Sequence, residues 1–202
     1  MNLFADNFSE ALVLYKEGKP NKLIHYYDKA CNTNNVQGCA SLGKIYAKEG
    51  NSVKAVISWR KACNLGSADS CLLLGLVYDS RTKVISKNKT NDELLLNKML
   101  KEIPQDKIKS KIFFDEACSL GNPNGCFFIA KIYKEEKNYI KAMLYFTIAC
   151  NKNNAGGCKY LGRMYAESGS TEKALSFYRK ACNLGNKKAC KLISNFQKLY
   201  PN

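Results

Sequence analysis

Hydrophobic and small residues recur along this chain at helical spacing. In each of five copies a Leu or Ile is followed directly by a small residue, and in four copies a Tyr stands three positions further on. Spacings of three and four place such residues on one face of a helix. The small residue would let a neighbouring helix approach closely. The five copies are Leu42-Gly43-Tyr46, Leu74-Gly75-Tyr78, Ile129-Ala130-Tyr133, Leu161-Gly162-Tyr165 and Ile193-Ser194, the last with Gln197 in place of Tyr.

Turn-forming residues separate these helical stretches. Glu49-Gly50-Asn51-Ser52 and Glu167-Ser168-Gly169-Ser170 mark one kind of boundary, with Ser52 and Thr171 as predicted N-caps. Asn64-Leu65-Gly66 and its counterpart at 183–185 mark a second, shorter turn. The pattern therefore predicts helix–turn–helix units with about a dozen residues per helix, stacked into a right-handed solenoid with a concave face.

The ten cysteines follow the same repeat. They form five couples with partners eight positions apart, and each first cysteine is preceded by Ala and, four positions earlier, by an aromatic residue. Successive couples begin 32 residues apart, except for one gap of 55. Because identical units should pair identically, the sequence predicts disulfides within the couples, each closing a loop of about nine residues. The couples are Cys31–Cys39, Cys63–Cys71, Cys118–Cys126, Cys150–Cys158 and Cys182–Cys190.

Two alternatives to disulfides remain at this stage, free thiols and a metal site. Zinc ligands usually stand two to four residues apart with further Cys or His nearby, so seven intervening residues and a single His fit zinc poorly. One His also excludes sites that need two imidazoles. We therefore expect no metal and no cofactor.

The segment from Lys61 to Tyr78, with its Ala-Cys, Asn-Leu-Gly and second-Cys framework, resembles Sel-one-like repeats (SLR), relatives of the tetratricopeptide repeat. The framework is similar to the Helicobacter cysteine-rich protein (Hcp) family over roughly residues 20–200. The resemblance implies exported α/α solenoids with disulfides inside each hairpin. It also implies either secreted proteins that engage a host or penicillin-binding proteins with weak β-lactamase activity. This chain has a shorter period than that family, and its second unit carries 23 additional residues.

The fold class expected is therefore all-α, an α/α solenoid of tetratricopeptide-like helical hairpins stapled by disulfides. We expect one solenoid domain over 1–202, with an N-terminal cap pair at 1–30, repeats at 31–181, an insertion near 79–103 and a C-terminal cap at 182–202. Pro20 is expected near the start of a helix. Within the insertion, 81–89 is predicted to loop out and 91–103 to form an amphipathic helix with Leu95, Met99 and Ile103 on one face. That helix is either an ornament or a partner-binding element.

Charge changes the functional picture. The chain carries a net charge of +15, with 46% hydrophobic residues, which argues against disorder. Basic residues recur one position after the small residue of the motif, and Lys134 follows one helical turn later. Such a ladder in the concave groove would bind an acidic peptide, a C-terminal carboxylate or an anionic glycan; the alternative is a solvated lysine face. The predicted groove residues are Lys44, Lys131, Lys134, Arg163 and Asn195.

Catalytic chemistry finds little support in the sequence. Ser-x-x-Lys occurs at Ser41, Ser86 and Ser170, about as often as chance allows, and no Ser-Asp-Asn or Lys-Thr-Gly accompanies it. His25 is expected to be a partly buried structural residue. No nucleic-acid motif is present, and no apolar run approaches the roughly 18 residues of a membrane span.

The sequence therefore predicts an exported, monomeric adaptor that binds a protein, peptide or glycan, with a weak penicillin-binding or β-lactamase activity as the alternative. The expected location is the bacterial periplasm or the medium, with the mitochondrial intermembrane space as the alternative. The first seven residues show no signal-peptide pattern, so we expect an exported form to have carried a signal that this sequence lacks.

Overall fold

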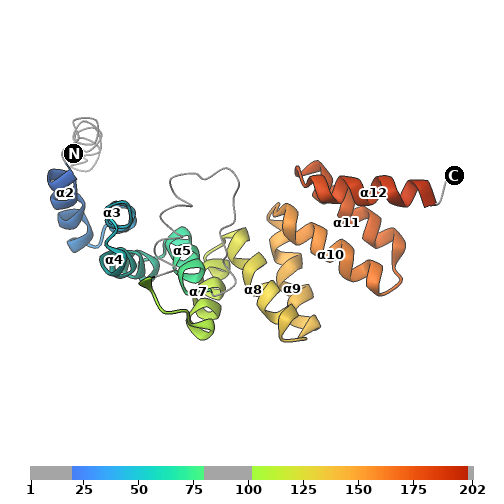
Figure 1. Ribbon diagram of the computed structural model, residues 1–202, viewed down its shortest axis with the longest axis horizontal. Helices are drawn as coiled ribbons and strands as arrows, with labels where there is room; N and C mark the ends of the chain where they lie inside the picture. The colour runs from blue at the N-terminus through green and yellow to red at the C-terminus, as the bar shows by residue number, and fades with distance from the viewer. Residues whose placement is uncertain (1–19, 80–101, 200–202) are drawn as a thin grey trace. The chain divides into compact units, whose positions relative to one another are not determined.

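The chain is described here by a computed structural model, which covers residues 20–79 and 102–199 (Figure 1). The first helix of the expected N-terminal pair, the loop at 81–89 and most of the helix at 91–103 lie outside these residues. The described part contains ten helices and no strand. None of its helices is long and apolar enough to cross a membrane. The ten helices are α2 (Pro20–Asn32), α3 (Val36–Lys48), α4 (Ser52–Asn64), α5 (Ala68–Tyr78), α7 (Lys107–Ser119), α8 (Pro123–Glu135), α9 (Tyr139–Asn151), α10 (Ala155–Glu167), α11 (Thr171–Asn183) and α12 (Lys187–Leu199).

The helices share one length and one cysteine register. Nine of the ten described helices have 13 residues, and α5 has 11. Every first cysteine is the second-last residue of its helix, and every second cysteine is the fourth residue of the next. α2 begins at Pro20, as predicted, and the last helix begins at Lys187. The helical-hairpin prediction is confirmed.

The turn inside each hairpin depends on one residue with positive φ. Gly66, Gly121 and Gly185 have φ between +87° and +96°. Asn34 and Asn153 occupy the same position of the turn in their hairpins, with φ of +61° and +62°. Gly and Asn are the residues that tolerate this left-handed region. The next residue caps the following helix: Asn35, for example, accepts a hydrogen bond from the backbone N–H of Gly38 at 2.7 Å. Three residues thus reverse the chain between two antiparallel helices.

The turn between hairpins corrects two predicted caps. The N-cap of α4 is Asn51, whose side chain accepts from the N–H of Lys54, and Ser52 is already helical. The N-cap position of α11 is Ser170 and not Thr171, although the Ser170 side chain makes no capping hydrogen bond. At Asn51 the physical reason is that the amide oxygen reaches the third helical N–H, which leaves the hydroxyl of the next residue for other partners. Ser52 instead donates to Glu102.

All ten cysteines are paired as the repeat predicted. The five disulfides join residues eight apart with Cα–Cα distances of 4.4–4.9 Å, within the range that such bonds require. No free cysteine remains. The disulfide alternative is therefore confirmed over free thiols.

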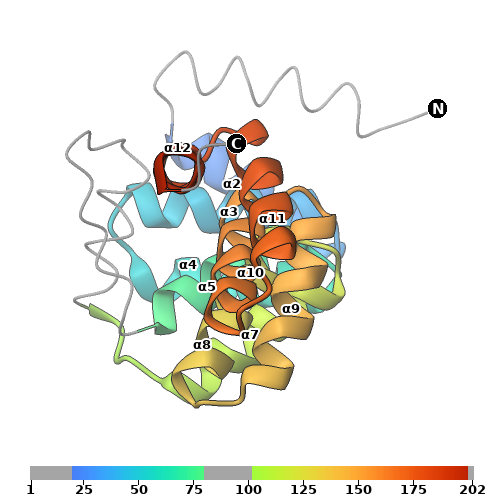
Figure 2. The ribbon, with the colours of Figure 1, turned by 90° about the vertical axis from the view of Figure 1, so that its right-hand side faces the viewer.

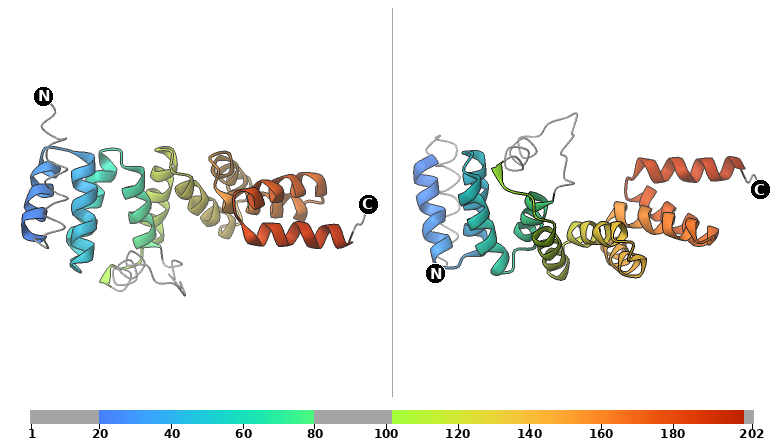
Figure 3. Two further views of the ribbon diagram at one scale, coloured as in Figure 1. Left: turned by 90° about the horizontal axis from the view of Figure 1, so that it is seen from above. Right: turned by 60° about the horizontal axis from the view of Figure 1, so that its bottom comes forward.

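The chain divides into two compact units, Met1–Ser110 and Lys111–Asn202, which are described separately. In unit 1, α3 packs against both α2 and α4, and α4 against α5 (Figure 3). In unit 2, α9 packs against α8 and α10, and α11 against α10 and α12 (Figure 2). Large buried side chains fill both units, among them Trp59 and Leu74 in unit 1 and Phe146 and Leu161 in unit 2. The single-domain expectation stays a prediction.

The small residue of the repeat lies where an aromatic ring of the next helix approaches. A Cβ atom added to Gly43 would come within 2.4 Å of the Trp59 ring, and one added to Gly162 within 2.7 Å of Tyr178. Both rings are at least nine-tenths buried. The helix pairs α3–α4 and α10–α11 can therefore pack at this distance only with glycine, which confirms the predicted role of the small residue.

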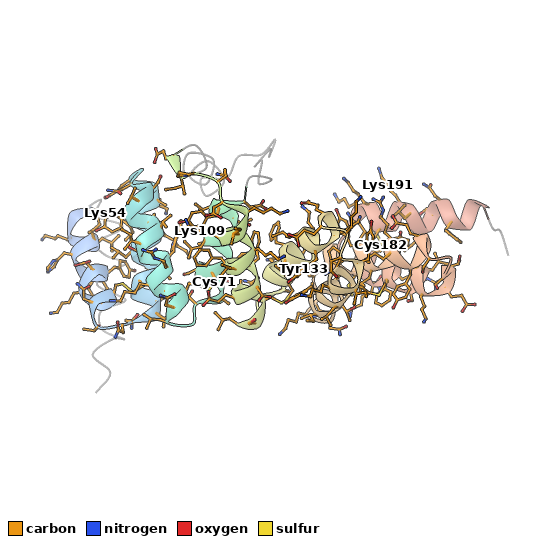
Figure 4. All side chains as sticks on the ribbon, turned by 90° about the horizontal axis from the view of Figure 1, so that it is seen from below. Lys54, Cys71, Lys109, Tyr133, Cys182 and Lys191 are labelled. Atoms are coloured by element: carbon orange, nitrogen blue, oxygen red, sulfur yellow. A yellow bond between two sulfur atoms is a disulfide. The ribbon has the colours of Figure 1, made fainter. Side chains whose placement is uncertain are left out.

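The tyrosine of the repeat has a partner that the sequence analysis did not find. Four tyrosine rings carry a lysine ammonium above them, at 5.2 Å (Lys54–Tyr46), 5.3 Å (Lys109–Tyr78), 5.2 Å (Lys141–Tyr133) and 5.6 Å (Lys173–Tyr165). Lys54, Lys109 and Tyr133 are labelled in Figure 4. In each pair the lysine is the third residue of the helix that follows the tyrosine helix in the repeat. Cation–π contacts of this kind contribute about 0.5–1 kcal/mol at exposed sites.

The first prediction concerns Gly43. We expect Gly43→Ala to lower the free energy of unfolding by about 1–3 kcal/mol, because the new methyl group must displace Trp59 from a packed core. Helix propensity alone would raise stability by about 1 kcal/mol. Denaturant unfolding measures whether the free energy of unfolding falls or rises. Ala130, which already carries a methyl group in the same register, supplies the matched variant Ala130→Gly. A stabilised Gly43→Ala chain would show that the contact with Trp59 does not limit packing.

The second prediction concerns the disulfides. The chain denatured without reductant and treated with an alkylating reagent should gain no mass, because every sulfur is bonded to another. After reduction the same treatment should add ten labels, one for each cysteine. Intact-mass spectrometry checks both. Labelling of unreduced protein would contradict the pairing.

Candidate ligand-binding pocket

A basic pocket lies at the C-terminal end of unit 2. Helices α10, α11 and α12 border an open pocket of about 670 Å³. Its polar lining consists of Lys159, Arg163 and Glu167 from α10 and of Lys188, Lys191 and Asn195 from α12 (Lys191 is labelled in Figure 4). Ala166, Tyr178 and Leu192 supply an apolar wall. Four cations and one carboxylate therefore share one concave surface.

The disulfide register positions these side chains. Lys159 directly follows Cys158, and Lys191 directly follows Cys190. Arg163 and Asn195 stand four residues later on the same two helices, so each pair lies on one helical face. Because each second cysteine is bonded to the preceding helix, its neighbours have little rotational freedom. The pocket is thus built from the same two positions of two successive hairpins.

Positive charge is concentrated around Lys159. Burial lowers the pKa of this half-buried amine, and the cations Lys188, Arg163, Lys131 and Lys134 lower it further. Repulsion between like charges disfavours the ammonium form in such a cluster. A bound carboxylate would relieve this repulsion, so the cluster favours an anionic ligand.

Arg163 is held by one acidic neighbour. Its Nε lies 2.7 Å from Oε1 of Glu167 one turn later, and this hydrogen bond raises the pKa of the guanidinium. Both side chains are more than half exposed, at 61% and 54%, so the pair adds little to stability. Its Nε is engaged by Glu167, and the guanidinium has further N–H donors. Arg163 can therefore face a second carboxylate while keeping the first.

An aromatic surface continues from the pocket onto α8. The ammonium groups of Lys159 and Lys134 lie 4.7 Å and 5.1 Å from the centroid of the Tyr160 ring. Lys131 lies over the neighbouring rings of Phe127 and Phe128 at just under 6 Å. Rings beneath several lysines reduce their mutual repulsion through cation–π attraction. These contacts link the lysines of α8 to those of α10.

The predicted groove residues fall into three groups. Arg163 and Asn195 line the pocket together. Lys131 and Lys134 act on Lys159 from α8. Lys44 lies exposed on α3 and belongs to unit 1, whereas the other four belong to unit 2. Their role in binding stays a prediction. The sequence analysis missed Lys159, Lys188 and Lys191, although the position directly after the second cysteine would have revealed two of them.

The other candidates from the sequence have ordinary surroundings. Ser41, half-buried on α3, accepts a hydrogen bond from Gln37 at 3.5 Å. Ser170 caps α11 and begins no catalytic arrangement that the described residues show. His25 is exposed on α2, which contradicts the expectation of partial burial. The reason is its register: His25 stands two residues after the buried Leu23, which places it on the opposite face of α2.

Exposed aliphatic pairs mark a second surface feature. The second and sixth residues of α4, α7 and α9 are Val53 and Ile57, Ile108 and Ile112, and Ile140 and Leu144, all more than half exposed. The same positions of α2 and α11 hold polar residues. In α4 the pair borders a volume of about 430 Å³ that is also lined by Ile103 and Pro104. The pairs belong to the three consecutive hairpins α4–α5, α7–α8 and α9–α10, and not to α2–α3 or α11–α12.

Comparison with known proteins agrees with this geometry. The Sel1 repeat family matches residues 100–122 and 131–154, and the tetratricopeptide repeat family matches residues 161–191. No significant relative was found among curated proteins.

Solved structures of the same fold include a Sel1 repeat protein from Oxalobacter formigenes, with 21% identity, a TM-score of 0.64 and coverage of 88% of this chain and 71% of that one. MamA is similar at 20% identity and a TM-score of 0.50, covering 89% and 96%. Helicobacter pylori cysteine rich protein B is 27% identical over 70% of this chain and 94% of that one, with a TM-score of 0.47. Residues 100–122 and 131–154 therefore match the Sel1 repeat, and the fold is an α/α solenoid of the Sel1-like and tetratricopeptide-like kind, stapled in this chain by five disulfides.

Proposed function

We propose that this chain is an exported adaptor that binds an acidic peptide segment of a partner protein in the basic pocket of unit 2. The observation that carries the proposal is the convergence of Lys159, Arg163, Lys188 and Lys191 on one pocket with an apolar wall. Repeat proteins of this class use the surfaces of successive hairpins for extended ligands.

The pocket chemistry favours a peptide over a purely polar anion. Cations orient carboxylates, and Arg163 can do so through two parallel N–H groups. Tyr178 and Leu192 offer apolar surface beside them. Ligand sites commonly combine such a wall with a few placed polar groups. A segment that alternates acidic and apolar side chains satisfies both parts of this lining, whereas a sulfated glycan satisfies only the first.

The disulfides support export. Ten paired cysteines in 202 residues are typical of proteins that fold in an oxidising compartment such as the periplasm or the medium. In the cytosol, the thiol-based reductants would oppose this state. The proposed partner is therefore sought outside the reducing cytoplasm.

The third prediction tests the pocket directly. The double variant Arg163→Gln with Lys188→Gln should weaken binding of a labelled peptide of alternating Glu and Leu by at least about tenfold, because two charge-assisted contacts are removed. Fluorescence anisotropy gives the dissociation constant. Binding should also weaken as salt is added, since the contacts are partly exposed.

The matched control is Lys22→Gln with Lys29→Gln, which removes the same charge from exposed positions of α2. Equal loss of affinity in both double variants would show that net charge, and not the pocket, attracts the peptide. Equal affinity for a peptide with Gln in place of Glu would contradict an acidic ligand. The single variant Lys44→Gln measures whether unit 1 takes part.

The fourth prediction concerns pH. Because the pKa of Lys159 is lowered, this amine loses its proton at lower pH than an ordinary lysine as pH rises. Peptide affinity should therefore fall on the alkaline side, below the range in which ordinary lysines titrate. Lys159→Arg, whose guanidinium stays charged, should flatten this fall. An identical pH profile for both proteins would exclude Lys159 from the binding step.

A further inference from the structure

One disulfide differs from the other four in its exposure. The eight cysteines of the first four pairs are all at most 7% exposed. Cys182 and Cys190 are both half-buried (Cys182 and Cys71 are labelled in Figure 4). A thiolate must reach a sulfur along the S–S axis to exchange with it, so access sets the rate. In the folded chain the last pair is therefore the most accessible of the five.

The position of this disulfide in the repeat explains its exposure. Inside unit 2 the Cys150–Cys158 pair lies between α9 and α10, and α10 is covered in turn by α11. Cys182–Cys190 joins α11 to α12, the last described helix. Among the described side chains of α12 only Ala189 is buried. Among the described side chains, α12 is held by the disulfide, by Ala189 and by the partly buried Ile193.

The charge around Cys190 also differs from that around the other second cysteines. Lys187, Lys188 and Lys191 stand within three residues of it, whereas the four other second cysteines together have one such cation, Lys159. Cys190 lies in the first turns of α12, where Asn186 caps the helix through the N–H of Ala189. Nearby cations and a helix N-terminus both stabilise a thiolate. Cys182 also has two cations nearby, Arg179 and Lys180, but it lies in the last turn of α11, where the helix dipole disfavours a thiolate. Its position near a helix N-terminus therefore makes Cys190 the better leaving group of the pair.

We propose that Cys182–Cys190 is a thiol–disulfide exchange site for a dithiol reductant. A thiolate of the dithiol attacks Sγ of Cys182, the S–S bond breaks, and Cys190 leaves as the thiolate. The second thiol of the dithiol then attacks the mixed disulfide and releases Cys182. The dithiol is oxidised by two electrons to its disulfide, and its two protons pass to Cys182 and Cys190.

Exchange at this site controls the basic pocket. Lys188, Lys191, Leu192 and Asn195 reach the pocket from α12. Once the bond to α11 is broken, few buried contacts hold α12 against it, and these side chains separate from Lys159 and Arg163. Reduction therefore releases an acidic ligand. This consequence rests on the proposed function, whereas the exchange site itself does not.

The test is native-state reduction with dithiothreitol, stopped by alkylation and followed by peptide mapping. Cys182 and Cys190 should become labelled at a rate about tenfold or more above that of any other pair, because the buried pairs must await local opening. Parallel labelling of all five pairs, or faster labelling of another pair, would overturn the proposal.

Two further measurements test separately the role of the lysines and the effect of reduction on the pocket. The variant Lys187→Gln, Lys188→Gln and Lys191→Gln should slow labelling of Cys182 and Cys190, while Lys44→Gln, Lys48→Gln and Lys54→Gln, with the same charge change, should not. Equal labelling rates in both variants would show that Lys187, Lys188 and Lys191 do not promote the exchange. Selective reduction should abolish binding of the Glu-Leu peptide. If the oxidised protein never binds that peptide, the proposed function fails while the labelling result stands; binding unaffected by reduction overturns the control of the pocket.

Discussion

The structure depends on how the chain reverses between two helices joined by a disulfide. A single residue with positive φ, a capping residue and a bond between positions eight apart fix the second helix against the first. On the chain-entropy model each small closed loop stabilises the fold by about 2–3 kcal/mol. The bond also removes the freedom of the two helices to slide or rotate. Five repetitions of this constraint give helices of nearly constant length, because each must present its cysteine at the same point.

Side-chain positions follow from that register. The residue after each second cysteine and the one four further on lie on the same helical face, and in α10 and α12 these positions supply the pocket. The third residue of each following helix lies over a repeat tyrosine, as Lys54 does over Tyr46. In the pair Lys109–Tyr78 the contact persists although the insertion separates the two residues in sequence. The contact between the repeat tyrosine and the lysine is thus kept across the additional residues.

Much of the fold could be predicted because each residue that defines the repeat acts on the structure next to it in the sequence. Gly66 and Gly185 mark turns, Gly43 marks close packing, and equal spacing of cysteines selects one pairing out of many. The N-caps were wrong by one residue because both Asn51 and Ser52 are capping residues, and only the backbone direction decides between them. The contact of Lys109 with Tyr78 could not be found by spacing, since the insertion hides the period.

The candidate site was predicted less well for a different reason. Sequence spacing identifies positions within one helix, but a pocket needs neighbours from three helices. Arg163 and Asn195 could be placed together from the sequence because they share a repeat position, whereas Lys188 stands two residues before its cysteine and breaks the pattern. The exposure of His25 shows the same limit, since an apolar neighbourhood in sequence does not fix which side of a helix is covered.

The last described hairpin, α11–α12, carries both ligand-facing charge and an accessible disulfide. The preceding hairpin also contributes cations to the pocket, Lys159 and Arg163, but its disulfide is buried. In α12 the two pocket lysines are exposed, and Cys182 and Cys190 are only half-buried. Charge for a ligand and access for a reductant therefore meet in the hairpin α11–α12. For this reason a redox change acts on binding in this hairpin while the four buried disulfides preserve the rest of the fold.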